Sequence, residues 1–171
     1  MREEKLYIKP DQFYKRNKIT IITNKTVIKI DRNKKKIYTD GSEPYSYDKL
    51  VLATGSIMNR LEVDRANKKI FYLRTLDDAK RIRSALKKNK KLVVIGAGYI
   101  GLEIAASAKK QKVTVIEMEN RIMSRSVSPH ISNFFQKKHE VMGINFLLST
   151  RVNVIDQNKH RQNRIFLDNN S

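Results

Sequence analysis

The chain has 171 residues, 40% of them apolar, which suits one domain of ordinary size or pieces of two. It contains no cysteine, and this excludes a disulfide framework, a thiolate metal site and a dithiol redox centre. No apolar run reaches the length of a membrane span, and the opening MREEKLYIKP lacks the apolar core of a signal peptide. We therefore expect a cytoplasmic protein with no membrane partner.

The formal net charge of +19 is large for this length. A basic surface attracts polyanions, so both nucleic acid and an acidic protein partner have to be considered. The positive charges come in short lysine clusters at predicted turns and helix ends, without a stripe of interleaved aromatic residues. The clusters are Lys34–Lys36, Lys68–Lys69, Lys87–Lys88, Lys90–Lys91, Lys109–Lys110 and Lys137–Lys138. This pattern favours a solvated lysine-rich surface over a nucleic-acid site, and it leaves an acidic protein partner open.

Apolar residues alternate with polar ones between Lys18 and Thr54, which predicts a small antiparallel meander. Its strands are expected at Ile19–Ile21, Val27–Ile30 and Ile37–Thr39, and the Asp40-Gly41 pair closes the run with a turn.

A continuous apolar run follows, Leu50–Ala53 within YDKLVLATGS, and it is typical of a strand covered on both faces. Gly55 ends this strand, and Ile57–Lys69 has the irregular pattern of a connecting loop. A helix is expected from about Leu76, because Thr75 is a good N-cap and apolar residues then recur at helical spacing.

From residue 91 onward the pattern predicts alternating strands and helices. The expected elements are a strand at Leu92–Ile95, a helix at Tyr99–Lys109, a strand at Val113–Glu117, a helix from Ser128-Pro129 to near Gly143, a strand at Ile144–Leu148, and a hairpin of Val152–Ile155 and Ile165–Leu167. Such alternation predicts an α/β, Rossmann-type three-layer domain over residues 91–171, with a boundary near Lys88–Lys91.

The most informative stretch is LVVIGAGYIGLE, residues 92–103. Gly96 lets the chain turn sharply out of the strand, and Gly98 leaves room for a pyrophosphate. Gly101 lets the helix pack close to the sheet. The start of the helix offers unpaired N–H groups to the phosphates. A strand-to-helix turn without a ligand is the alternative, because glycines also gather in ordinary turns.

An acidic residue, Glu117, ends the next predicted strand, where a carboxylate accepts hydrogen bonds from a ribose diol and repels a 2′-phosphate. Met118, Glu119 and Asn120 follow it, so no adjacent basic residue favours NADP. The pattern therefore predicts NAD. Glu103, in the second turn of the helix, suits a polar contact toward a nicotinamide, and an exposed helix position is its alternative.

Five separated motifs then occur in the order seen in one group of flavoproteins: YDKLVLATGS, YLRTLDDAKRI, LVVIGAGYIGLEIAASA, VTVIE and SPHISNFFQKKHEVMGI. Through them the chain, from about Leu6 to Leu167, resembles the FAD-dependent ferredoxin and rubredoxin reductases that serve oxygenase and cytochrome P450 systems. These belong to the wider pyridine nucleotide–disulfide oxidoreductase superfamily. The absence of cysteine agrees with the resemblance, because this group passes electrons through flavin alone.

The resemblance implies an enzyme, a flavoprotein oxidoreductase with FAD and NAD as cofactors. NADH reduces the flavin, which then releases single electrons to a ferredoxin- or rubredoxin-type iron–sulfur protein. No catalytic protein residue and no metal is implied, because the flavin carries the chemistry. By position, Gly96, Gly98, Gly101 and Glu117 resemble the NAD site, and Glu103 resembles the glutamate beside the nicotinamide.

Four further residues resemble positions near FAD: Thr54 and Gly55 at a strand end, Arg74 in YLRT, and Val27 in the meander near the adenine. The alternatives are a core position for Val27 and an ordinary surface arginine for Arg74.

The resemblance also implies that parts of the family's fold lie outside this sequence, among them the glycine turn that holds the FAD pyrophosphate. We therefore expect residues 1–90 to be a partial FAD-binding domain with a β-meander, and residues 91–171 a C-terminally incomplete NAD-binding domain. This central part of a reductase is expected to be inactive alone and to self-associate through open sheet edges. The alternative is a non-catalytic NAD-binding module that senses redox state.

Overall fold

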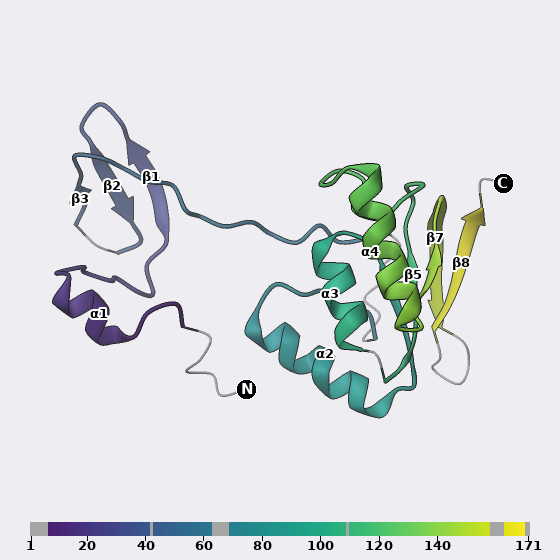
Figure 1. Cartoon of the computed structure of the whole chain (residues 1–171). Helices are drawn as coiled ribbons and strands as arrows, with labels where there is room; N and C mark the ends of the chain where they lie inside the picture. Colours follow the sequence, from purple (N-terminus) through teal and green to yellow (C-terminus); the bar gives the residue numbers. More distant parts are fainter. Residues whose placement is uncertain (1–6, 42, 63–68, 109, 158–162, 170–171) are drawn as a thin grey trace. The chain divides into compact units, whose positions relative to one another are not determined.

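The computed structural model describes residues 7–41, 43–62, 69–108, 110–157 and 163–169 (Figure 1). They form two compact units that divide between Gly55 and Ser56. This division lies ahead of the predicted boundary at Lys88–Lys91, because the helix before that boundary packs with the second unit. The cofactor domains assigned to residues 1–90 and 91–171 stay a prediction.

The first unit holds a short helix and a three-stranded antiparallel meander. Its elements are α1 (Asp11–Arg16), β1 (Val27–Asp31), β2 (Lys36–Thr39) and β3 (Tyr45–Ser46), with strand order β1-β2-β3. In the β1–β2 turn the Asp31 carboxylate accepts a hydrogen bond from the Lys34 N–H at 2.9 Å, and Lys35 adopts a φ of +48°. The predicted meander is confirmed, with strands near Val27–Ile30 and Ile37–Thr39.

Two predicted strands of this unit are wrong. Ile19–Ile21 and Leu50–Ala53 both lie outside strands, and the third strand of the meander is Tyr45–Ser46 instead. Val51 and Leu52 are 84% and 67% exposed. An apolar run becomes a strand only where neighbouring strands satisfy its backbone groups, and no described segment pairs with either run. The predicted loop at 57–69 is irregular where it is described, and residues 63–68 lie outside the described part.

The second unit begins with helix α2 (Leu76–Lys88), as predicted from its cap. Thr75 Oγ1 accepts from the Asp78 N–H, while the Asp78 carboxylate accepts from the Thr75 N–H at 2.8 Å, a reciprocal capping box. The helix belongs to this unit because Leu86 packs against its core and the Gln111 side chain donates to the Leu86 carbonyl at 2.9 Å.

A parallel sheet with strand order β4-β5-β6 forms the centre of this unit. The strands are β4 (Lys91–Ile95), β5 (Lys112–Ile116) and β6 (Asn145–Leu147), joined by helices α3 (Tyr99–Ser107) and α4 (Pro129–Val141). Each element lies within about two residues of its prediction, and Lys109 lies outside the described residues. Ser128 caps α4 and Pro129 opens it, as expected.

The sheet of the second unit lies between two other layers (Figure 1). One face carries the core, in which Val94, Val113 and Val115 meet Leu102 and Ala105 of α3. On the other side a hairpin of β7 (Thr150–Gln157) and β8 (Asn163–Asn169) lies against β5. The predicted α/β three-layer fold and closing hairpin are confirmed. Within the described residues, no helix is long and apolar enough to cross a membrane.

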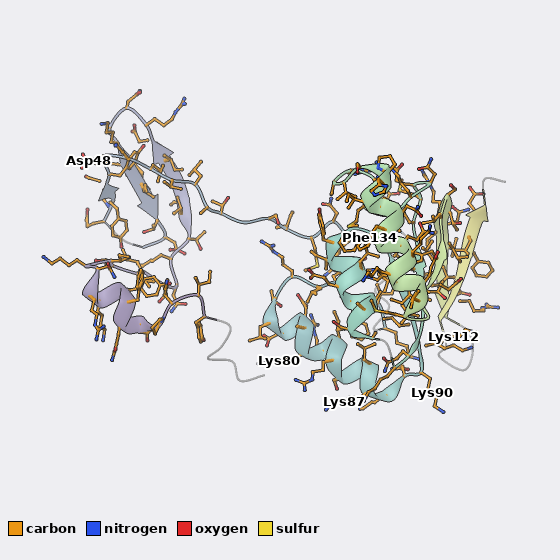
Figure 2. The ribbon with its side chains drawn as sticks, in the orientation of Figure 1. Asp48, Lys80, Lys87, Lys90, Lys112 and Phe134 are labelled. Carbon is orange, nitrogen blue, oxygen red and sulfur yellow. The ribbon has the colours of Figure 1, made fainter. Side chains whose placement is uncertain are left out.

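The fold brings together lysines that the sequence separates. Lys112 donates its N–H to the Lys90 carbonyl at 2.8 Å, and Lys91 lies opposite Lys112 in the β4–β5 register. Figure 2 shows Lys87, Lys90 and Lys112 at the same end of the second unit, and all of these lysines are exposed. This end is the amino edge of the sheet, since β4 and β5 both begin there. The clusters are therefore less scattered than the sequence suggests.

Candidate functional site

The connection between β4 and α3 is a sharp turn at the carboxyl edge of the sheet. Gly96 adopts a φ of +98°, a conformation that residues with a side chain rarely take, and its N–H donates to the Ile116 carbonyl at 2.8 Å. The chain can thus leave β4 and enter α3 within three residues. This confirms that Gly96 makes a tight turn, while its binding of a nucleotide stays a prediction.

Gly101 and Gly98 have opposite surroundings. A Cβ on Gly101 would overlap the Gly96 carbonyl oxygen and approach Val94 Cγ1 to 3.3 Å, so the close approach of α3 to the turn requires glycine. A Cβ on Gly98 would meet nothing within 4 Å. Gly98 is the N-cap of α3 and provides no capping side chain, so an accessible space adjoins the free N–H groups of the first helical turn. Such a space suits an anion.

Glu117 directly follows β5 and lies beside the glycine turn. Its N–H donates to the Leu147 carbonyl at 2.8 Å, which fixes its backbone to the end of β6. Its carboxylate accepts two backbone hydrogen bonds, from the Ala97 N–H at 2.7 Å and from the Glu119 N–H at 3.0 Å. The side chain is half-buried. The fold therefore brings Gly96, Gly98 and Glu117 together at one edge, as the sequence predicts.

The loop of residues 121–127, which was not predicted as part of the site, lies against the glycine turn. The Met123 N–H donates to the Ala97 carbonyl at 3.0 Å, so Ala97 is bound through both its N–H and its carbonyl. Arg121 holds the loop by donating to the Val127 and Ser124 carbonyls at 2.9 and 2.6 Å. The Arg125 guanidinium lies 3.9 Å from the Glu119 carboxylate. A buried apolar Ile122-Met123 pair between polar residues was the available sequence signal for this loop.

Glu103 lies one turn into α3 and is exposed. Together with Tyr99 it lines a largely apolar hollow of about 190 Å³ that Phe135 and His139 of α4 also line. His139 is buried, and its Nδ1 lies 2.8 Å from the Phe135 carbonyl oxygen. The hollow forms only where α3 and α4 come together, so no local sequence pattern predicts it. Contact of Glu103 with a nicotinamide stays a prediction.

The four residues predicted near FAD are divided between the units. Val27 lies on β1 and is 52% exposed, which does not fit the alternative of a core position. Thr54 and Gly55 lie in an extended exposed segment of the first unit, where Gly55 has a φ of +70°. Arg74 belongs to the second unit, and its N–H donates to the Asp78 carboxylate at 3.1 Å. Their role toward FAD stays a prediction.

No group of three or more His, Asp or Glu side chains that could hold a metal ion occurs among the described residues.

Comparison with known proteins identifies relatives over nearly the whole chain. A model of the family described as pyridine nucleotide-disulphide oxidoreductase matches residues 3–171. A rubredoxin-NAD(+) reductase of Pseudomonas putida is 35% identical over 169 residues, which are 97% of this chain and 44% of the relative. A rhodocoxin reductase of Rhodococcus erythropolis is 38% identical over 156 residues, which are 90% of this chain and 36% of the relative.

Solved structures of reductases also match nearly the whole chain. The chain matches a ferredoxin reductase from Rhodopseudomonas palustris with a TM-score of 0.84 and 33% identity, over 96% of this chain and 41% of that one. It matches a covalent putidaredoxin reductase–putidaredoxin complex with a TM-score of 0.82 and 32% identity, again over 96% and 41%. The chain thus spans less than half the length of the curated relatives it matches.

Proposed function

The chain belongs to the pyridine nucleotide-disulphide oxidoreductase family, and from this premise we propose that it forms the central part of a flavoprotein reductase. That reductase passes electrons from NADH through FAD to a ferredoxin- or rubredoxin-type iron–sulfur protein. The observation that carries the proposal is the glycine turn of β4 and α3 with the Glu117 carboxylate beside it. The names of the relatives support the acceptor class, since they include rubredoxin and putidaredoxin reductases.

The residues present fit a dinucleotide. The space at Gly98 is free of protein atoms where a Cβ would stand, and a pyrophosphate there would meet the N–H groups that begin α3. Each Glu117 oxygen accepts one backbone hydrogen bond, and a carboxylate has about four acceptor positions, so a ribose diol can still donate to it. A 2′-phosphate in the same place would be repelled. We therefore assign NAD(H) to this site.

In the proposed mechanism, this chain positions the cofactors. When bound, FAD would supply the chemistry that the protein side chains lack, namely acceptance of an electron pair from NADH and its release as single electrons. Gly96 and Gly98 shape the pyrophosphate site and Glu117 orients the ribose. Glu103 would contact the nicotinamide, as the family resemblance implies.

The FAD side of the proposal rests on Val27, Thr54, Gly55 and Arg74. The chain has no cysteine, so the disulfide step that the family name describes has no pair of thiols here. This part of the reductase therefore supplies no disulfide to the electron path, and flavin is proposed to connect NADH to the acceptor.

Self-association is part of the proposal. Strands β4 and β6 each pair with β5 alone among the described strands, so each presents an unpaired edge. Val93 and Ile95 on β4 are 42% and 37% exposed, which adds an apolar face near one of these edges. A rising apparent mass with concentration in analytical ultracentrifugation would support association, and a constant monomer mass would contradict it.

A non-catalytic NAD-binding module is the second candidate. It is favoured by the distribution of the predicted residues: the proposed NAD residues all lie in the second unit, whereas the proposed FAD residues are divided between the two units. A module of this kind needs no flavin.

The test uses the purified chain. Titration with NADH and NADPH should give tighter binding of NADH, and the Gly98→Ala variant should lose NADH binding because its Cβ fills the pyrophosphate space.

An oxidised-flavin absorption band would favour the reductase, while colourless protein that binds NADH would favour the module. With NADH, added FAD and ferricyanide we expect little or no turnover, because electron transfer needs two complete dinucleotide sites in fixed relation. Equal NADH affinity of wild type and Gly98→Ala would refute the nucleotide site.

A further inference from the structure

We propose that Glu117 is a positioning residue for the glycine turn, holding it in its nucleotide-binding conformation before any nucleotide arrives. The proposal rests on the NAD site proposed above and adds a second role to the carboxylate, one that does not act through the ribose.

The carboxylate of Glu117 joins two segments of the site. One oxygen accepts the Ala97 N–H at 2.7 Å, from the turn between β4 and α3, and the other accepts the Glu119 N–H at 3.0 Å, from the chain after β5. These segments lie twenty residues apart in the chain. Hydrogen bonds to an ionised acceptor are about twice as strong as neutral ones. The side chain thus links the turn between β4 and α3 to the chain after β5.

The bond to Ala97 is the important one because Ala97 has no exposed surface. A buried N–H that loses its acceptor pays the cost of desolvation without compensation. The Ala97 carbonyl is already engaged by the Met123 N–H at 3.0 Å, so the turn is held on both sides of this residue. Without the Glu117 carboxylate, the turn would have to move to expose the Ala97 N–H to water.

Glutamine at position 117 separates this role from ribose binding. An amide has the same shape as the carboxylate but only one accepting oxygen, so its NH₂ group would face one of the two backbone donors, the Ala97 N–H or the Glu119 N–H. A ribose hydroxyl both donates and accepts, so it can pair with either end of the amide. Glu117→Gln therefore weakens the link between the glycine turn and the chain after β5 more than it weakens the contact with the ribose diol.

The first measurement is amide hydrogen exchange of the nucleotide-free chain by NMR. We expect the backbone amide that faces the new NH₂ group, Ala97 or Glu119, to exchange about tenfold faster or more in Glu117→Gln than in wild type. The amides of Val113 and Val115 in the sheet should keep their rates, which shows that the fold is intact. Glu119→Gln is the matched control: it changes the neighbouring carboxylate, which faces Arg125, and should leave the Ala97 rate unchanged. Unchanged exchange of both the Ala97 and Glu119 amides in Glu117→Gln would overturn the proposal.

The second measurement uses two probes, ADP and 2′,3′-dideoxy-ADP, which lacks the ribose diol. If Glu117 positions the turn, Glu117→Gln weakens both probes by a similar factor, about fivefold or more. If only ADP is weakened, the carboxylate acts through the ribose alone and the positioning role is wrong. If wild type binds neither probe, the proposed nucleotide site fails, while the exchange comparison still decides whether Glu117 holds the turn.

Discussion

The two compact units differ in how far their apolar residues are buried. In the first unit Ile28 and Val51 are 67% and 84% exposed, and Thr39 is the buried residue among those described there. In the second unit Ala97, Ala105, Val115 and Ile122 have no exposed surface and belong to one continuous core. The meander is thus held by hydrogen bonds and turns, whereas the sheet and its helices are held by packing as well.

This difference indicates that turn residues close together in the sequence are enough to form secondary structure but not to make it stable. The β1–β2 turn is specified within a few residues, by the Asp31 side chain and the positive φ of Lys35. A small sheet without a covered face is marginal in water, however, because net hydrogen bonding contributes little and burial contributes most. Four predictions test this contrast, from the largest expected effect to the smallest.

The largest effect concerns local unfolding. Backbone amides of β1 and β2, such as those of Ile30 and Ile37, should exchange with solvent about a thousandfold faster than those of Val113 and Val115, because the first unit opens without breaking the core. Hydrogen exchange of the full chain by NMR or mass spectrometry measures this. Equal protection in both units would mean that the meander is as stable as the sheet and that the contrast is wrong.

The second effect concerns two glycines of one turn. Gly101→Ala should destabilise the second unit by about 3 kcal/mol, the upper part of the range for overpacking, because its Cβ meets the Gly96 backbone and Val94. Gly98→Ala is the matched control, since its Cβ meets no protein atom, and it should keep the stability within about 0.5 kcal/mol. Urea unfolding followed by circular dichroism compares them. Equal losses from both substitutions would contradict the packing role of Gly101.

The third effect concerns the cap of α2. Hydrogen bonds from Thr75 and then the Arg81 guanidinium hold the pKa of Asp78 well below its usual value of 3.8. A carboxyl group whose pKa is lower in the folded state stabilises the fold above the unfolded value and loses that contribution as the pH falls below it. Asp78→Asn should therefore be less stable than wild type at about pH 6, and the gap should narrow below about pH 3.8.

Urea midpoints of the two proteins at several pH values measure this gap. Thr75→Ala removes the other half of the capping box and should cost about 1 kcal/mol. A gap between wild type and Asp78→Asn that stays constant from pH 6 to the acid limit would show that the ionised carboxylate does not stabilise the helix.

The smallest effect concerns the lysines at the amino edge of the sheet. Lys91 and Lys112 lie opposite each other in the register of β4 and β5, and neither is paired with a carboxylate among the described residues. Lys112→Glu should stabilise the second unit by about 0.5 kcal/mol, because a repulsion becomes an attraction. Thermal unfolding measures it, and the gain should shrink in about 0.5 M salt. A gain that does not depend on salt would contradict the electrostatic cause.

Local sequence determined much of this protein. The turn at Gly96 depends on the backbone freedom of glycine, and the starts of α2 and α4 depend on hydrogen bonds from Thr75 and Ser128 to residues three positions along. These features could therefore be predicted directly. The parallel pairing of β4, β5 and β6 agrees with the predicted alternation of strands and helices. The motifs also identified the family over nearly the whole chain.

Tertiary structure decided what depends on partners far away in the chain. The apolar run Leu50–Ala53 reads as a buried strand, yet it pairs with no described strand, because a strand exists only where neighbours accept its hydrogen bonds. Helix α2 joins the second unit through Leu86, which periodicity alone does not reveal. Glu117 was predicted from its place after β5, but its bond to the buried Ala97 N–H arises only when the parallel strands bring the two turns to the same edge.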